Sequence, residues 1–106
     1  MRLRASDYSI WLQFWAETAL NPALRPIHND FYSRWMDAVV SIVKRGQRHG
    51  IYRGVDPVQF ARLLTSATDG AAIKIFTGAP DMTIDAMRTM LVTILEKELS
   101  PASSHV

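Results

Sequence analysis

The sequence of 106 residues contains no cysteine. This absence excludes a disulfide framework, a thiolate zinc site and a cysteine nucleophile, and it fits a protein of a reducing compartment. No run of apolar residues reaches the roughly 18 residues that a membrane-spanning helix needs. Gln13 and Glu17 also interrupt the apolar stretch that a signal peptide would place behind the N-terminus. We therefore expect a cytoplasmic protein without a membrane contact.

The sequence also has little net charge. Twelve basic and ten acidic residues leave a net charge of +2, with the basic excess in the first half of the chain. A protein that binds nucleic acid through phosphates usually carries a denser basic surface. The basic group at the end of the second predicted helix, Lys44, Arg45, Arg48, His49 and Arg53, is better explained as cations that complement a helix C-terminus. We expect no direct contact between this chain and nucleic acid.

Sequence motifs of catalysis and of metal binding are missing too. No serine lies in a nucleophile-elbow motif, no histidine pair has the spacing of a zinc helix, and no glycine cluster has the pattern of a phosphate-binding loop. Glu17, Asp30 and Asp69 are the acids closest to apolar residues, but nothing in the sequence brings two of them together. We expect no enzymatic activity, no metal and no cofactor.

Apolar residues recur with helical spacing in four segments, and none alternates with period two. The stripes run over about 8–19, 26–49, 57–77 and 83–99. They predict an all-α antiparallel domain of about four helices over residues 1–99, with a flexible tail at 100–106. In the second helix one broad apolar face is predicted, formed by Ile27, Phe31, Trp35, Ala38, Val39, Ile42 and Val43.

Local signals place the helix ends. Asn21 and Pro22 predict a single turn at 22–25, and Pro26 a kink or a fresh start, because a proline inside a helix removes a backbone donor. Gly50 is expected to end the second helix. Asp56, with Gln59 as a capping-box partner, should begin the third. Thr83 or Asp81 should cap the fourth.

Aromatic residues gather in the first 35 positions, on two successive helices. As a group they exceed what the packing of two helices requires, although core packing is the simpler explanation for any single ring. Aromatic walls with a few polar groups are typical of sites for small organic molecules. His28 fits either a polar contact to such a ligand or a partly buried histidine with ordinary partners. The expected ligand-binding residues are Trp11, Phe14, Trp15, His28, Phe31, Tyr32, Trp35, Leu64 and Thr68.

The last two helices carry more apolar surface than four helices can cover. Small residues near Gly70 permit a close helix approach, and the methionines of the last helix make a wide apolar surface. A second copy of the chain would cover both, with the last two helices of each copy forming a four-helix-bundle interface. We therefore expect a homodimer. Its interface residues are predicted to be Gly70, Ile73, Phe76, Met87, Met90, Leu91 and Ile94.

Residues 8–99 resemble the C-terminal regulatory domain of the TetR family of bacterial transcriptional regulators, nearest its BetI-type branch. The resemblance rests on the segments 11–17, 32–35, 46–47 with Gly50, 55–57, 61–64 and 69–70. It implies that the first three helices surround an inducer cavity and that the last two form the dimer interface. It also implies a DNA-reading helix-turn-helix that is not in this chain. Pro26, Ala71 and Lys74 depart from the family's usual residues.

The sequence thus leads to three hypotheses. The first is the ligand-sensing and homodimerisation domain of a TetR-family regulator, whose ligand is a small hydrophobic or cationic organic molecule. The second is an interaction module that forms mixed dimers with full-length regulators. A densely packed interior without a cavity would favour this hypothesis. The third is a small helical enzyme, which would need Glu17 or His28 to titrate near neutrality beside a substrate.

Overall fold

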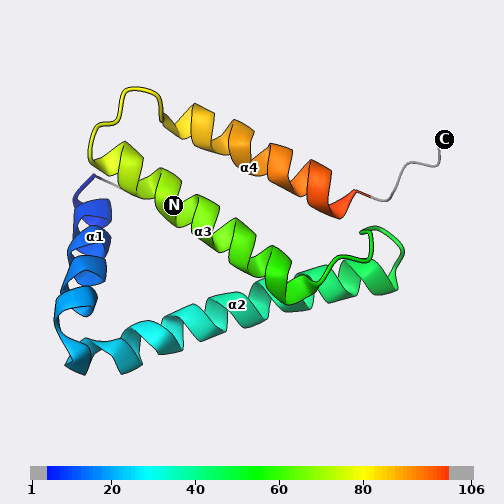
Figure 1. The fold of residues 1–106 in the computed structure, drawn as a ribbon, viewed down its shortest axis with the longest axis horizontal. Helices are drawn as coiled ribbons and strands as arrows, with labels where there is room; N and C mark the ends of the chain where they lie inside the picture. Colours follow the sequence, from blue (N-terminus) through cyan, green and yellow to red (C-terminus); the bar gives the residue numbers. More distant parts are fainter. Residues whose placement is uncertain (1–4, 101–106) are drawn as a thin grey trace. The chain divides into compact units, whose positions relative to one another are not determined.

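The computed structural model describes residues 5–100, and within them it contains helices and no strand. The helices are α1 (Ala5–Leu20), the 3₁₀ turn η1 (Pro22–Leu24), α2 (Arg25–Arg48), α3 (Pro57–Phe76) and α4 (Ile84–Leu99) (Figure 1). The prediction of an all-α fold with about four helices is therefore confirmed. Residues 101–106 of the predicted tail lie outside the described part of the chain. None of the described helices is both long and apolar enough to cross a membrane.

The chain divides into two compact units, and the boundary between residues 34 and 35 falls inside α2. The first unit holds α1, η1 and the first turns of α2. The second unit holds the rest of α2, the loop that follows it, α3 and α4.

In the first unit the chain turns between α1 and α2 as the proline pattern predicts. The side chain of Asn21 accepts a hydrogen bond from the backbone N–H of Ala23 at 3.0 Å, and Pro22 takes the first position of η1. Pro26 is the second residue of α2, where its missing N–H removes no bond that the helix would otherwise make. Pro26 therefore starts a new helix instead of kinking an old one.

The core of the second unit lies where the second half of α2 meets the start of α3 and the end of α4. Its buried residues are Val39, Val43, Phe60, Ala61 and Leu99, and partly buried Met36, Val40, Tyr52, Val55, Leu64 and Ile94 pack around them. Val43 is only 1% exposed. Burial of an aliphatic side chain of this size contributes about 1.5–3 kcal/mol to stability, so Val43 holds α2 firmly in this core.

Only part of the predicted apolar face of α2 is buried. The predicted face contained seven residues, but only Val39 and Val43 of these are buried. Ile27, Phe31, Trp35, Ala38 and Ile42 are exposed. Helical periodicity marks every apolar side of a helix, whereas the core of the second unit covers only the stripe through Val39 and Val43. The rest of this apolar face is therefore left accessible.

The loop after α2 is held by hydrogen bonds to both its ends. Gly50 has a positive φ of 72°, and the N–H of Ile51 donates to the carbonyl of Gly46 at 2.8 Å, which closes the helix as predicted. The side-chain Nε2 of Gln47 donates to the carbonyls of Arg53 and Val55, at 2.9 and 2.8 Å. The loop therefore has a defined path from α2 to α3.

Arg53 connects this loop to the end of α4. Its backbone N–H donates to the carbonyl of Leu99 at 2.9 Å, and its guanidinium donates to the carbonyl of Lys97 at 3.4 Å. A helix C-terminus leaves its last carbonyls without intrahelical partners. One member of the basic group therefore satisfies the end of α4, and not the end of α2 that the sequence suggested.

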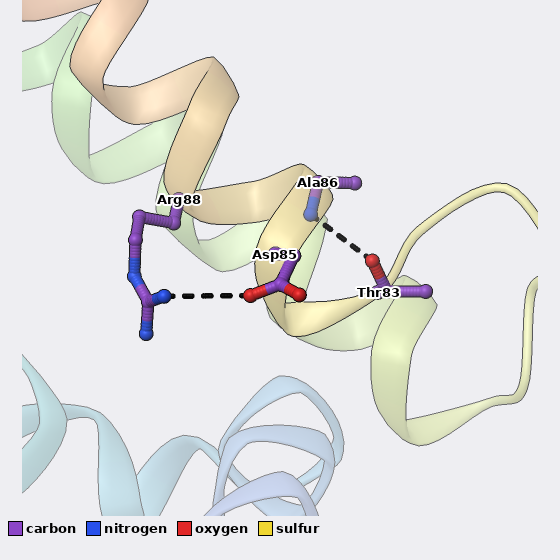
Figure 2. Close-up of polar contacts among 4 residues, drawn as sticks. All are labelled: Thr83, Asp85, Ala86 and Arg88. Carbon is purple, nitrogen blue, oxygen red and sulfur yellow. Dashed lines mark hydrogen bonds and ion pairs between the residues drawn. The ribbon is translucent and has the colours of Figure 1, made fainter.

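Helices α3 and α4 run side by side in opposite directions (Figure 1). The side chain of Asp56 caps α3 by accepting the N–H groups of Val58 at 2.9 Å and Gln59 at 3.3 Å. Gln59 takes part through its backbone, and no bond from its side chain back to Asp56 is seen in the described residues. Thr83, and not Asp81, caps α4: its hydroxyl accepts the N–H of Ala86 at 3.0 Å, beside an exposed ion pair between Asp85 and Arg88 (Figure 2).

Candidate ligand-binding site

Three of the predicted ligand residues meet in the first unit. The ring centroids of Phe14 and His28 are 6.5 Å apart, and those of His28 and Tyr32 are 6.4 Å apart with nearly parallel planes. Phe14 comes from α1, while His28 and Tyr32 lie one turn apart on α2. The turn at η1 brings the half-buried imidazole of His28 between two aromatic rings.

The other aromatic residues of this unit are more open. Trp11 is half-buried, Trp15 is 40% exposed and Phe31 is 63% exposed. An accessible aromatic ring can accept a ligand, whereas a ring in a filled core cannot. The first unit therefore presents aromatic side chains at its surface instead of enclosing them.

The three predicted ligand residues of the second unit differ in what their side chains do. Leu64 packs against the core of its own unit. The hydroxyl of Thr68 donates to the carbonyl of Leu64 at 2.8 Å, within α3. Trp35 is 49% exposed, and its indole Nε1 donates to the hydroxyl of Thr65 at 2.7 Å. Of the three, Trp35 offers the largest accessible apolar surface.

Thr65 was missed by the sequence analysis although it is a buried polar residue. It is 7% exposed. The signal that could have found it is its spacing on α3: Ala61, Thr65 and Thr68 follow each other at i, i+4 and i+7. Such a stripe places a hydroxyl group on the helix face that packs against a neighbouring element.

Two of the acidic residues near the aromatic groups are exposed. Glu17 is exposed, and Asp30 makes an exposed ion pair with Arg34 at 3.1 Å on the same helix. No group of three or more metal-ligating side chains occurs within residues 5–100. Three grooves of ≈ 190 to ≈ 290 Å³ surround the loop after α2, and none of the nine predicted residues lines any of them.

The predicted interface residues lie on α3 and α4. Ile94 packs against the core of its own unit, and the others are half-buried except for exposed Gly70. A Cβ atom at Gly70 would meet no atom of the chain within 4 Å. Several larger apolar residues of the same two helices are exposed: Val58, Leu63, Ile84, Val92 and Leu95. The chain itself therefore leaves much of the apolar surface of α3 and α4 uncovered.

Comparisons with known proteins lead to one family profile and to a solved transcriptional regulator. The profile described as "BetI-type transcriptional repressor, C-terminal" matches residues 2–100. Among solved structures, a candidate transcriptional regulator from Saccharomonospora viridis, crystallised in complex with choline, is 34% identical and superposes with a TM-score of 0.82. The match covers 89% of this chain and 49% of that protein, so the chain spans about half the length of its structural relative. No curated protein matches the sequence.

Both matches are to transcriptional regulators rather than to enzymes. The profile covers nearly the whole chain, and the structural match covers 89% of it. The chain belongs to the family of BetI-type transcriptional repressors, as a C-terminal domain of the TetR type.

Proposed function

We propose that this chain is the ligand-sensing and homodimerisation domain of a TetR-family transcriptional regulator, and that its ligand is a small organic cation of the choline class. The observation that carries the proposal is the likeness to the S. viridis protein, which was crystallised with choline and is 34% identical over most of this chain. The match covers only about half of that protein. We therefore also propose, and do not take from the likeness alone, that the regulator acts in the cytoplasm and controls transcription.

The chemistry of a quaternary ammonium group supports aromatic recognition. Such a group has no N–H to donate, and aromatic faces attract it electrostatically. The rings around His28 and the accessible indole of Trp35 supply surfaces of this kind. The proposed ligand-binding residues are the nine of the sequence prediction: Trp11, Phe14, Trp15, His28, Phe31, Tyr32, Trp35, Leu64 and Thr68.

The uncovered apolar surface of α3 and α4 supports homodimerisation. Isolated apolar residues at a protein surface are ordinary, but a patch of them on two adjacent helices is typical of an interface. Gly70 adds to this support, because a glycine within a helix costs about 1 kcal/mol relative to alanine and no atom of its own chain requires it. The close approach of a second chain would explain that glycine.

Ligand binding and dimerisation together would give a sensor. A ligand shifts a conformational equilibrium only through its different affinities for the two states. We propose that the cation favours one packing of the aromatic helices, and that the paired α3 and α4 helices transmit this choice to the other half of each regulator. In this proposal the other half of the full-length regulator makes the contact with DNA.

The proposal is tested by isothermal titration calorimetry of the 106-residue chain with choline. We expect saturable binding with one choline per chain and a Kd of roughly micromolar to millimolar, which corresponds to about −8 to −4 kcal/mol. The matched control ligand is 3,3-dimethyl-1-butanol, which replaces the ammonium nitrogen of choline by carbon and is uncharged.

The control ligand should bind several-fold more weakly, because it lacks the charge that aromatic faces attract. Two results would overturn the proposed ligand class. One is no saturable heat with choline, and the other is equal affinity for choline and its uncharged analogue.

A further inference from the structure

Trp35 combines an exposed side chain with a fixed orientation. About half of its surface is accessible, at 49%, yet its Nε1 donates a 2.7 Å hydrogen bond to the hydroxyl of Thr65 on α3. An exposed side chain without such a bond samples several rotamers and loses that freedom when it binds a ligand. The bond to Thr65 has already restricted the indole of Trp35.

Thr65 differs from four other threonines in the partner of its hydroxyl. Within the described residues, the hydroxyls of Thr18, Thr68, Thr77 and Thr93 donate to a backbone carbonyl one turn back in the chain, which is the common arrangement. The hydroxyl of Thr65 instead contacts two side chains of α2: it accepts from Trp35 and donates to the Sδ of Met36 at 3.7 Å.

The burial of Thr65 makes this difference informative. The residue is 7% exposed, and valine has the same shape without a hydroxyl that must be satisfied. Valine at this position would give α3 a similar helix propensity and at least as much apolar packing as threonine does. What the hydroxyl adds is its two contacts with α2, and the shorter of them is the hydrogen bond from the indole of Trp35.

We propose that Thr65 is a positioning residue that holds the indole of Trp35 as a preoriented platform for the cationic head group of the ligand. The inference rests on the proposed function, because it assumes a small organic cation as the ligand. Tryptophan offers the strongest cation–π surface among the side chains. Thr65 does not touch the cation and acts only through Trp35.

The test compares Thr65→Val with Thr65→Ser in the 106-residue chain, by calorimetric titration with choline and with 3,3-dimethyl-1-butanol. Thr65→Val should weaken choline binding about threefold to tenfold, the range of a partly lost cation–π contact. It should change binding of the uncharged analogue less than about twofold. Thr65→Ser keeps the hydroxyl and should retain the affinity for choline.

The matched control is Thr93→Val, which removes a hydroxyl that bonds only to the carbonyl of Thr89 in its own helix. It should leave both affinities unchanged. A structural readout accompanies the titrations: in ¹H–¹⁵N spectra the indole N–H of Trp35 should exchange with water faster in Thr65→Val than in the wild-type chain.

A second variant keeps the test decisive if Thr65→Val does not fold. Trp35→Phe keeps an aromatic ring at a half-exposed position but removes the donor Nε1, and it should weaken choline binding to a similar extent. Where both single variants fold, their double variant should bind choline no more weakly than Trp35→Phe alone, because Thr65 acts through Trp35.

The possible outcomes separate this inference from the proposed function. If the wild-type chain binds choline but Thr65→Val keeps the wild-type ratio of the two affinities, the positioning role is wrong and the proposed function stands. If Trp35→Phe leaves that ratio unchanged, or the effects of the two changes add in the double variant, the positioning role is equally wrong. If the wild-type chain binds no choline, the proposed ligand class fails and this inference fails with it.

Discussion

Single residues in the last turn of α2 determine how the second unit closes. A Cβ atom at Gly46 would overlap the ring of Tyr52, which lies against the backbone of α2. Gln47, the next residue, supplies two hydrogen bonds to carbonyls of the loop. One position thus requires the absence of a side chain, and its neighbour requires a side-chain amide donor.

Gly46→Ala should lower the free energy of unfolding by about 1–3 kcal/mol, because the ring of Tyr52 must move to make room for the added methyl group. Chemical denaturation followed by circular dichroism measures the change. Gly54→Ala is the control, since a Cβ atom there meets nothing within 4 Å; it should leave stability unchanged or slightly higher. Equal effects of the two substitutions would contradict the close contact.

Gln47→Ala should destabilise the chain by about 1–2 kcal/mol, because the carbonyls of Arg53 and Val55 lose their common donor. Gln59→Ala is the matched control, as the side chain of Gln59 is exposed at the start of α3. That control should change stability by less than about 0.5 kcal/mol. The same denaturation experiment distinguishes the two, and a stable Gln47→Ala chain would show that the loop does not need this amide.

At the scale of the elements, the helix starts depend on short side chains that accept backbone N–H groups. Asp56 accepts two such groups at the start of α3, and Thr83 accepts one at the start of α4. Each cap replaces hydrogen bonds that the first turn of a helix cannot make internally. The antiparallel pair of α3 and α4 therefore begins at defined residues.

Asp56→Ala should destabilise the chain by about 0.5–2 kcal/mol through loss of the cap of α3. Asp81→Ala should have little effect, because Asp81 is exposed and Thr83 is the residue that caps α4. Thermal unfolding of the two variants side by side gives the comparison. A larger loss of stability for Asp81→Ala would contradict the assignment of the caps.

At the scale of the whole molecule, the described chain exposes more large hydrophobic side chains than it buries. This surplus lies on the aromatic helices and on α3 and α4, and the proposed function assigns the first group to a ligand and the second to another copy of the chain. The assignment to a dimer predicts that a charge on α4 separates the copies without unfolding them.

Met90→Asp should convert the dimer to a monomer while the helical circular dichroism persists. Met90 is half-buried and is not among the residues packed on the core, whereas Ile94 packs against that core and its replacement would also disturb folding. Thr89→Asp places the same charge on an exposed neighbouring position and should leave the dimer intact. Sedimentation velocity measures both, and a Met90→Asp chain that stays dimeric would remove this residue from the interface.

The sequence predicted the fold better than the surfaces, for physical reasons. Asp56 and Pro26 act through local backbone geometry, which adjacent residues determine, and the structure confirms a helix start at each. The burial of Phe31, Trp35 or Ile42 depends instead on what packs against them, and periodicity alone does not report this. Thr65 escaped notice because its role comes from Trp35, thirty residues away in the chain.

The nine proposed ligand residues and the seven proposed interface residues remain predictions of the sequence. Three of the nine, Phe14, His28 and Tyr32, have their rings near one another, but this proximity does not show that they bind a ligand. Which rings contact a ligand depends on the shape and charge of the ligand. The spacing of residues along a helix does not determine either property.

Native mass spectrometry of the chain with added choline tests the central claim most directly, because one spectrum reports both the number of chains and the number of bound cations. The proposed function predicts a dominant species of two chains that carries two cholines, with no comparable adduct from 3,3-dimethyl-1-butanol at the same concentration. A single chain without bound choline, at concentrations where the protein is folded, would contradict it.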